Sequence, residues 1–213
     1  YNFVTNIDGR GVYSFCMCPG GVVVPAATSQ GQQVVNGMSS SSRNTPWANS
    51  AIVTAIGKNE LENMGYQGLF AGMDFQDTLE RKAWEEGGGG LYAPAQVLTD
   101  FLEGKQSQAL PSSSYKPGIK SSLIHEWLPT LVYHRLASGL GYFGKKAPGF
   151  VSAHALLLGV ETRTSSPLRI PRTDQYRHPE IAGLYPCGEG AGYAGGIISA
   201  AMDGEKCAEY IGA

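Results

Sequence analysis

Side-chain types alternate in the first part of the chain, in the stretch GVYSFCMCPGGVVVPAA that begins at Gly11. Apolar and polar residues mix before Pro19-Gly20-Gly21 and β-branched residues follow it, which predicts two strands joined by a turn as a hairpin. Asn36–Ser50 is rich in residues that hydrogen-bond their own backbone, so we predict a loop there. The apolar run AIVTAI, from Ala51, predicts another short strand.

Helical periodicity follows. Phe75, Leu79 and Ala83 recur every four residues in DFQDTLERKAWEE, which predicts a helix that packs on a core by one face. PAQVLTDFLEG, from Pro94 to Gly104, predicts a second helix with one apolar stripe. The EEGGGG between them predicts a flexible connection, because consecutive glycines have too much conformational freedom to hold a helix or a strand.

The second half combines irregular, helical and extended patterns. We predict an irregular segment over Ser107–Gly118. A helix is predicted over Leu123–Leu140, with a break at Pro129. A strand is predicted at the start of ALLLGVETRTSSPLRIP. LYPCGEGAGYAGGIISAAMDGEKCAEYI, from Leu184, then predicts a short strand, a glycine-rich loop and a helix. This order of strands, helices, and a final strand and helix predicts an α+β fold.

The glycine-rich loop matches a dinucleotide-binding spacing, since Gly190, Gly192 and Gly195 satisfy G-x-G-x-x-G. A first Rossmann turn also needs a following strand and an acidic residue about 20 positions further on. Only 18 residues follow Gly195, and the predicted helix uses most of them. The spacing alone is therefore weak support for an opening dinucleotide turn.

The final helix carries a face of apolar and small residues, which predicts close packing against another element. That face consists of Ile197, Ala201, Gly204, Ala208 and Ile211. Its N-terminal end, with Glu189 and the amides from Gly195 to Ile197, is suited to a polyhydroxylated, anionic ligand.

Composition narrows the function classes. A formal net charge of -2 and a pI near 6.1 give no basic surplus for nucleic acid or an anionic membrane. No apolar run approaches the roughly 18 residues that span a bilayer. Four cysteines are too few for a disulfide framework, which favours a reducing compartment. We therefore expect a soluble, cytoplasmic protein, and the start at Tyr1 in a strand-like run indicates a piece of a longer one.

Charge and hydroxyl groups gather after the predicted strand at Leu156. Glu161, Arg163, Thr164, Ser165 and Ser166 follow its apolar residues. Arg163 is suited to binding an anionic substrate or a reduced ring, and the alternative is a solvent-facing salt pair on an amphipathic strand.

One hypothesis is that Cys16 and Cys18 form a redox-active dithiol. However, the separation of two residues at positions i and i+2 of an extended strand is at the long limit for a disulfide, so an internal bridge would be strained. We favour small, partly buried thiols. Neither the cysteines nor the four histidines form a metal-ligand pattern, so we expect no metal site.

Four motifs in order resemble the C-terminal part of the FAD-dependent dehydrogenases, in the broad glutathione-reductase-like group of flavoproteins. They are GVYSFCMCPGG, NGMS followed by an Arg and an ANS, GVETRTSSPLRI, and GLYPCGEGAGYAGGIISAAMDG. The resemblance implies a substrate-side insert domain with a mixed or antiparallel sheet over residues 1–166. It also implies a strand and helix over 167–213 that complete a discontinuous Rossmann-like FAD domain.

The resemblance also implies roles for individual residues. Gly188, Glu189 and Gly190 would lie against the ribityl and phosphate region, with the carboxylate accepting a ribityl hydroxyl. Gly195, Gly196 and Ile197 would begin a helix aimed at the pyrimidine edge of the flavin. Arg43 and Asn49, with Thr164 and Ser165, would line the cavity.

The function implied is that of an FAD-dependent oxidoreductase that acts on a small-molecule substrate by hydride transfer, with NAD(P)H as a candidate electron donor. No dinucleotide turn for the adenosine half occurs in the sequence, so we expect the isolated chain to bind FAD weakly or not at all and to be inactive. The alternative is a cofactor-free binding or interaction module that kept the scaffold.

Overall fold

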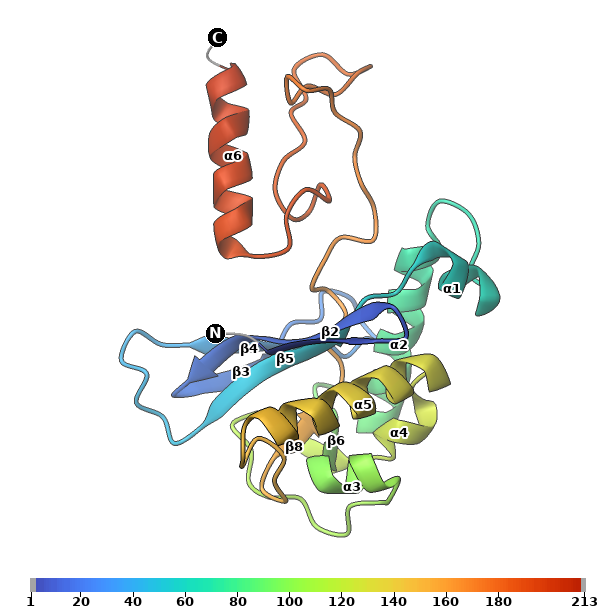
Figure 1. Cartoon of the computed structure of the whole chain (residues 1–213), viewed down its shortest axis with the longest axis vertical. Helices are drawn as coiled ribbons and strands as arrows, with labels where there is room; N and C mark the ends of the chain where they lie inside the picture. The colour runs from blue at the N-terminus through green and yellow to red at the C-terminus, as the bar shows by residue number, and fades with distance from the viewer. Residues whose placement is uncertain (1–2, 212–213) are drawn as a thin grey trace. The chain divides into compact units, whose positions relative to one another are not determined.

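A computed structural model describes residues 3–211 and has an α+β fold (Figure 1). The strands are β1 Phe3–Ile7, β2 Arg10–Pro19, β3 Gly21–Pro25, β4 Val35–Ser39, β5 Ala48–Thr54, β6 Ala93–Val97, β7 Ile119–Ser121 and β8 Leu156–Leu158. The helices are α1 Lys58–Asn63, α2 Ala71–Gly87, α3 Leu98–Glu103, α4 Ile124–Trp127, α5 Thr130–Lys146 and α6 Ile197–Ile211. Among residues 3–211, no helix is long and apolar enough to cross a membrane.

The chain forms two compact units. Unit 1 comprises residues 1–57 and 77–161, and unit 2 comprises residues 58–76 and 162–213. Helix α2 contributes residues to both, because the division falls between Gln76 and Asp77. The predicted domains 1–166 and 167–213 stay a prediction.

The first sheet of unit 1 has the antiparallel order β1-β2-β5, and helix α5 packs against all three strands (Figure 1). Alternation on β2 explains the contact, because Val12 and Ser14 are buried while Tyr13 points to the exposed face. Helix α5 supplies Phe143, fully buried and stacked on Phe3 with ring centroids 5.7 Å apart. The predicted helix with a break at Pro129 is confirmed as α4 and α5.

The predicted hairpin is wrong in its pairing. Both strands exist, but β2 pairs with β1 and β5, whereas β3 pairs antiparallel with β4 in a separate sheet. Gly20 redirects the chain between them with a φ of 64°, and a Cβ there would lie 2.0 Å from the backbone oxygen of Arg43. This close approach of the 40–47 loop sends the chain away from β2, so the turn does not close a hairpin.

The predicted loop Asn36–Ser50 is too long at both ends. Strand β4 extends to Ser39 and β5 begins at Ala48, so the irregular part is only 40–47. Pairing with β3 supplies the backbone hydrogen bonds that local composition did not predict.

The predicted helix from Pro94 to Gly104 is wrong in its first half. Residues 93–97 form β6, every residue of which is buried, between parallel β7 and antiparallel β8. Only Leu98–Glu103 is helical, and it ends at Gly104 in the left-handed conformation. A short, fully buried strand has no alternation to distinguish it from a buried helix, which explains the error.

Other predictions fare better. Helix α2 is confirmed, with Phe75, Leu79 and Ala83 buried. The glycine connection is confirmed for 88–90, which all have positive φ, while Gly87 still belongs to α2. The strand predicted after Ala155 is limited to the three residues of β8.

At the C-terminal end, helix α6 is confirmed but the short strand before it is not. Residues 184–187 have no strand partner within the part of the chain that the structure describes. The face of α6 predicted to pack is exposed in unit 2, with Ile197 82% and Ile211 57% exposed. The packed side of the helix carries Asp203 and buried Cys207 instead.

We predict that Gly139→Ala destabilises unit 1. A Cβ on this α5 residue would lie 2.5 Å from Cγ1 of fully buried Val12, so overpacking outweighs the better helix propensity of alanine. The expected loss is about 1–3 kcal/mol of unfolding free energy. All three tryptophans belong to unit 1, so urea denaturation followed by tryptophan fluorescence measures it.

The matched control is Gly141→Ala on the same helix, where a Cβ meets no heavy atom within 4 Å. This change should be neutral or stabilising by up to about 1 kcal/mol. Equal midpoints for the two variants would contradict the close packing of α5 on β2.

Candidate functional site

A hollow of about 250 Å³ in unit 2 brings together several of the predicted residues. Its walls are Gln76, Arg163, Ser165, Ser166, Pro167, Glu189 and Gly190. Two segments far apart in the sequence therefore meet, the one after β8 and the glycine-rich loop before α6. Arg163, Ser165, Glu189 and Gly190 were predicted, whereas Gln76 was not.

The wall that carries Arg163 and the serines is held by short polar contacts. Gln76 donates from Nε2 to the backbone oxygen of Thr162 at 2.8 Å, which ties the first turns of α2 to this wall. Ser166 donates from Oγ to the oxygen of Leu168 at 2.8 Å and accepts its N–H at 3.3 Å. These bonds give an otherwise irregular segment a defined path.

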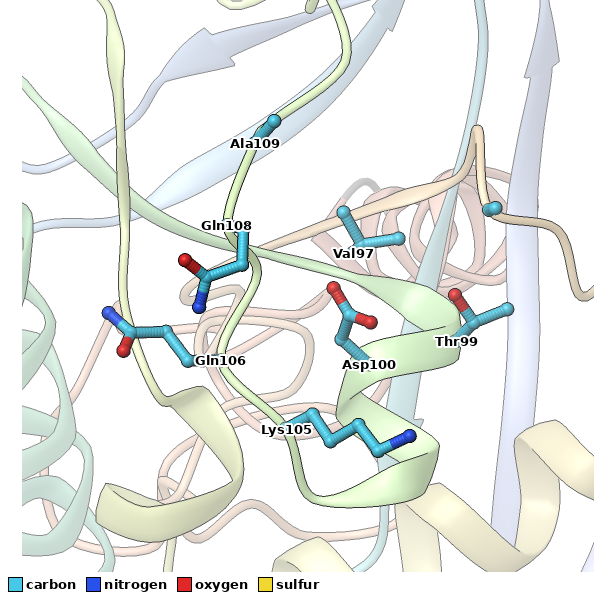
Figure 2. Close-up of a pocket in the computed structure, with 8 residues that line it drawn as sticks. Val97, Thr99, Asp100, Lys105, Gln106, Gln108 and Ala109 are labelled. Atoms are coloured by element: carbon cyan, nitrogen blue, oxygen red, sulfur yellow. The ribbon is translucent and has the colours of Figure 1, made fainter.

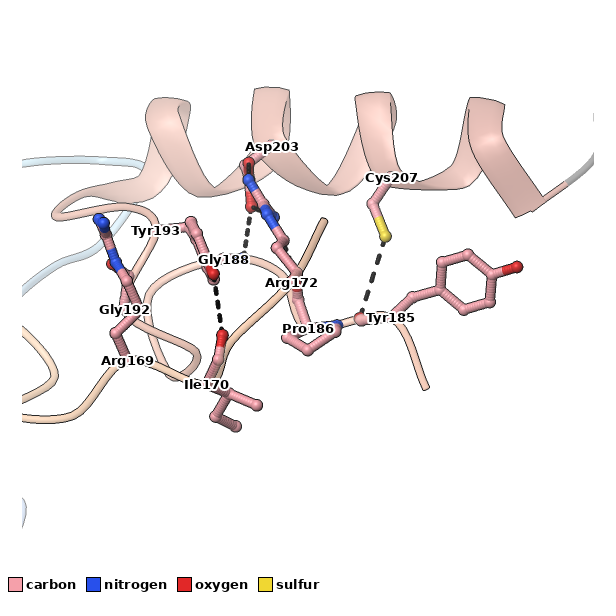
Figure 3. Close-up of polar contacts among 10 residues, drawn as sticks. All are labelled: Arg169, Ile170, Arg172, Tyr185, Pro186, Gly188, Gly192, Tyr193, Asp203 and Cys207. Carbon is pink, nitrogen blue, oxygen red and sulfur yellow. Dashed lines mark hydrogen bonds and ion pairs between the residues drawn. The ribbon is translucent and has the colours of Figure 1, made fainter. Parts of the chain in front are cut away.

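The turn that carries Glu189 depends on an ion pair (Figure 3). Arg172 donates from Nη1 and Nη2 to the two carboxylate oxygens of Asp203 at 2.9 and 2.7 Å. Asp203 also accepts the N–H of Gly188 at 2.8 Å, and Nη1 of Arg172 reaches the oxygen of Pro186 at 2.9 Å. The chain directly before Glu189 is therefore bound at two points to one bidentate pair, each side chain of which is 12% exposed.

Each side chain of this pair stabilises the ionised form of the other. The hydrogen bond from Arg172, joined by the N–H of Gly188, lowers the pKa of Asp203, although its desolvation acts in the opposite direction. The same hydrogen bond raises the pKa of Arg172. The contact thus persists as an ion pair throughout the neutral pH range.

Aromatic rings flank the guanidinium of Arg172. Its Cζ lies 3.5 Å from the ring centroid of Tyr193 and 4.2 Å from that of Tyr176. Tyr193 in turn donates from its hydroxyl to the oxygen of Ile170 at 2.8 Å (Figure 3). Cation–π contacts on a partly desolvated arginine add to the stability of the turn.

Helix α6 begins close to the hollow. A Cβ on Gly195 would lie 3.6 Å from Oγ of Ser165, so the glycine and the serine are neighbours. Gly196 accepts the N–H of Ala200 at 2.9 Å as the helix starts, and Ile197 is highly exposed. The first N–H groups of a helix have no partner within it, so this end can receive an acceptor atom of a ligand.

The remaining predicted residues do not join the hollow. Thr164 belongs to unit 2, and its Oγ1 is buried with no hydrogen-bond partner among the described residues. Glu161, Arg43 and Asn49 belong to unit 1. There, burial raises the pKa of Glu161 to about 7, which gives the carboxyl a proton to exchange near neutral pH.

Gln76, Arg172 and Asp203 were missed because no local pattern indicates them. Arg172 and Asp203 are 31 positions apart and unremarkable in their segments. Only folding brings them together, and no spacing rule in a single sequence marks such a pair.

Unit 1 contains a second depression, of about 640 Å³, beside the point where β6 runs directly into α3 (Figure 2). Thr99, Asp100, Gln106 and Gln108 give it a polar rim, and Lys105 directs its Nζ to Glu103 at 2.6 Å. None of the sequence-predicted residues lines it. Across residues 3–211, no group of three or more His, Cys, Asp or Glu side chains is arranged to hold a metal ion.

Comparison with known proteins finds two similarities. The family model for FAD-dependent protein, C-terminal domain-like, matches residues 1–164. An uncharacterised protein of Clostridium beijerinckii is 45% identical over 204 residues, which cover 95% of this chain and 38% of that relative. The chain thus spans well under half the length of the relative.

We predict that Asp203→Asn loosens the turn that carries Glu189. The substitution removes the charge from a paired carboxylate, and hydrogen bonds to charged groups contribute about 1.5–3 kcal/mol. Hydrogen–deuterium exchange should therefore be faster at the Gly188 amide. Glu205→Gln, at an exposed position of the same helix, is the control and should leave this exchange unchanged. Unaltered protection in Asp203→Asn would show that the pair does not hold the turn.

We also predict that Glu161 makes unit 1 less stable as pH rises. Its pKa is about 7 in the folded protein and ordinary in the unfolded chain, so between pH 4.5 and 7 the folded state binds more protons. The unfolding free energy should fall across this window by on the order of 2–3 kcal/mol and level off above it. Tryptophan-detected urea denaturation at several pH values measures the effect.

Glu161→Gln should remove that part of the pH dependence, because glutamine does not titrate. Glu209→Gln, at an exposed position of α6, should retain it. A wild-type stability that stays constant or rises from pH 5 to 7 would contradict the burial of a protonated Glu161.

Proposed function

The chain belongs to the family described as "FAD-dependent protein, C-terminal domain-like", and we propose its function from this membership. The chain is the C-terminal portion of an FAD-dependent oxidoreductase of the glutathione-reductase-like group, which acts on a small molecule. Residues 1–166 form the substrate-side insert, and 167–213 complete a Rossmann-like FAD domain. The observation that carries the proposal is the meeting of Glu189, Arg163 and the start of α6 at one hollow.

The residues at this hollow suit one part of FAD. Glu189 offers carboxylate acceptors to ribityl hydroxyls, Ser165 offers a hydroxyl, and the first turn of α6 offers N–H groups and a positive dipole end. The hollow is smaller than the roughly 300–1,000 Å³ of pockets for drug-sized ligands, so it fits a fragment of the cofactor better than the whole. This supports weak FAD binding by the isolated chain.

The exposed apolar face of α6 is consistent with a closing helix. Three neighbouring apolar side chains of this helix are largely exposed: 82% of Ile197, 72% of Ile198 and 52% of Met202. Contiguous exposed apolar side chains often mark a surface that another part of a protein covers. In the proposal, the preceding part of the FAD domain covers them. The greater length of the Clostridium beijerinckii relative supports a longer protein around this chain.

When bound, the flavin supplies hydride transfer, with NAD(P)H as the proposed donor. In the proposal, Glu189 orients the ribityl chain, and the α6 N-terminus stabilises negative charge at the pyrimidine edge. Arg163 binds an anionic substrate or the reduced ring. Glu161 holds a proton that it can release near neutral pH.

The second candidate is a cofactor-free binding or interaction module. The observation in its favour is that the hollow is small and open in unit 2 alone. The two candidates differ in one measurement. The full-length protein should purify with a flavin absorption spectrum that NADH or NADPH bleaches, whereas a cofactor-free module should show no such spectrum after reconstitution with FAD.

We predict that Glu189→Ala in the full-length protein weakens FAD binding by about 10–100-fold, because a charged hydrogen-bond acceptor contributes about 1.5–3 kcal/mol. Titration of the apoprotein with FAD, followed by quenching of flavin fluorescence, gives the dissociation constant. Glu180→Ala, at an exposed position outside the hollow, is the matched control and should bind FAD like the wild type. Equal affinity in both variants would remove Glu189 from the cofactor site.

A further inference from the structure

Strand β2 contains a bulge with one cysteine in it, Cys16, and a second directly after it, Cys18. The register with β5 is regular up to Phe15 and resumes at Cys18, so the residues between them are displaced from the ladder. Cys16 adopts a φ of 52°, an uncommon value for a residue with a Cβ, and its side chain is exposed. Bulges and positive φ values of this kind are concentrated near functional sites.

The two thiols lie together. Cys18 donates from Sγ to the backbone oxygen of Cys16 at 3.2 Å, and its thiol also interacts with the Cys16 thiol. The expectation that an internal bridge is strained assumed an extended strand. Because Cys16 is in the left-handed conformation, the backbone between the cysteines departs from an extended strand, which weakens that objection.

The surroundings of Cys18 act on its thiol. Burial, joined by the neighbouring Cys16, raises the pKa of the Cys18 thiol, while the positive charge of Arg43 acts in the opposite direction. The more exposed Cys16 is therefore better placed to react first.

The wall beside Cys18 is polar and crowded. Asn49 is its partner in the β5 register, and its amide group lies so close to Gly21 and Gly37 that a Cβ on either would meet it within 3 Å. Nδ2 of Asn49 is buried with no hydrogen-bond partner among the described residues. A donor is thus available to a polar group brought next to Cys18.

We propose that Cys16 and Cys18 form a dithiol–disulfide centre that exchanges with low-molecular-weight disulfides. The proposal is independent of flavin chemistry. The exposed thiolate of Cys16 attacks one sulfur of the disulfide RSSR and forms a mixed disulfide, and the first RS⁻ leaves and takes up a proton from solvent.

Cys18 then closes the reaction. It gives its proton to solvent and attacks the Cys16 sulfur, so the mixed disulfide breaks and the second RS⁻ leaves and takes up a proton from solvent. In sum, one protein dithiol and one RSSR become one protein disulfide and two RSH, and two electrons pass to the substrate. A low-molecular-weight dithiol reverses the change.

The test uses the full-length protein in which Cys187 and Cys207 are replaced by serine, kept anaerobic and in the dark. Oxidised glutathione should convert Cys16 and Cys18 into one internal disulfide and release two glutathione molecules per protein, as shown by alkylation and mass spectrometry. Dithiothreitol should restore both thiols. Two independently alkylated thiols at every ratio of oxidised to reduced glutathione would overturn the proposal, and this readout needs no variant at the bulge.

Two variants then assign the roles. Cys18→Ser should accumulate glutathione on Cys16. Cys16→Ser should react with oxidised glutathione more slowly than the wild type, because the remaining Cys18 thiol is less exposed. Glutathione trapped on Cys18 in this protein at the wild-type rate would overturn the order of attack.

Discussion

The bidentate pair of Arg172 and Asp203 is the contact on which the site in unit 2 depends. The described residues of unit 2, 58–76 and 162–211, include no strand, so strand pairing among them does not hold the loops. The pair links the segment before the glycine-rich turn, the turn itself through Gly188, and helix α6. It can do so because both side chains are largely withdrawn from solvent and the guanidinium lies on tyrosine rings, where charge-assisted bonds are stronger than at an open surface.

In unit 1 the corresponding constraint is that chain segments approach each other closely at glycine residues. Helix α5 reaches β2 because Gly139 leaves room for Val12, and β2 passes to β3 because Gly20 lets the 40–47 loop approach. The bulge lies in the same part of β2, where two residues of this strand stand against one of β5 shortly before the chain changes sheets. The two cysteines lie at this irregularity.

Sequence patterns succeeded where the determining contacts are local. Helices α2, α5 and α6 follow from periodicity and from Pro129. Sequence patterns gave a wrong prediction at β6, whose buried residues were predicted as part of a helix. They were also wrong about the hairpin, because β2 and β3 belong to different sheets. Glu161 and Arg163 were expected together at the end of the strand from Leu156, yet β8 ends at Leu158 and the two residues belong to different units.

The sequence by itself determined the α+β class, the long helices, the turn residues and the family resemblance, because these depend on residue types and spacing along the chain. Tertiary structure decided which strands pair, which face of α6 packs, and that Gln76, Arg172 and Asp203 support the hollow. It also decided that Glu161 is partly buried and that Cys16 leaves the extended conformation. The physical reason is that desolvation, ion pairing and strand pairing act between residues far apart in the chain, where no local pattern records them.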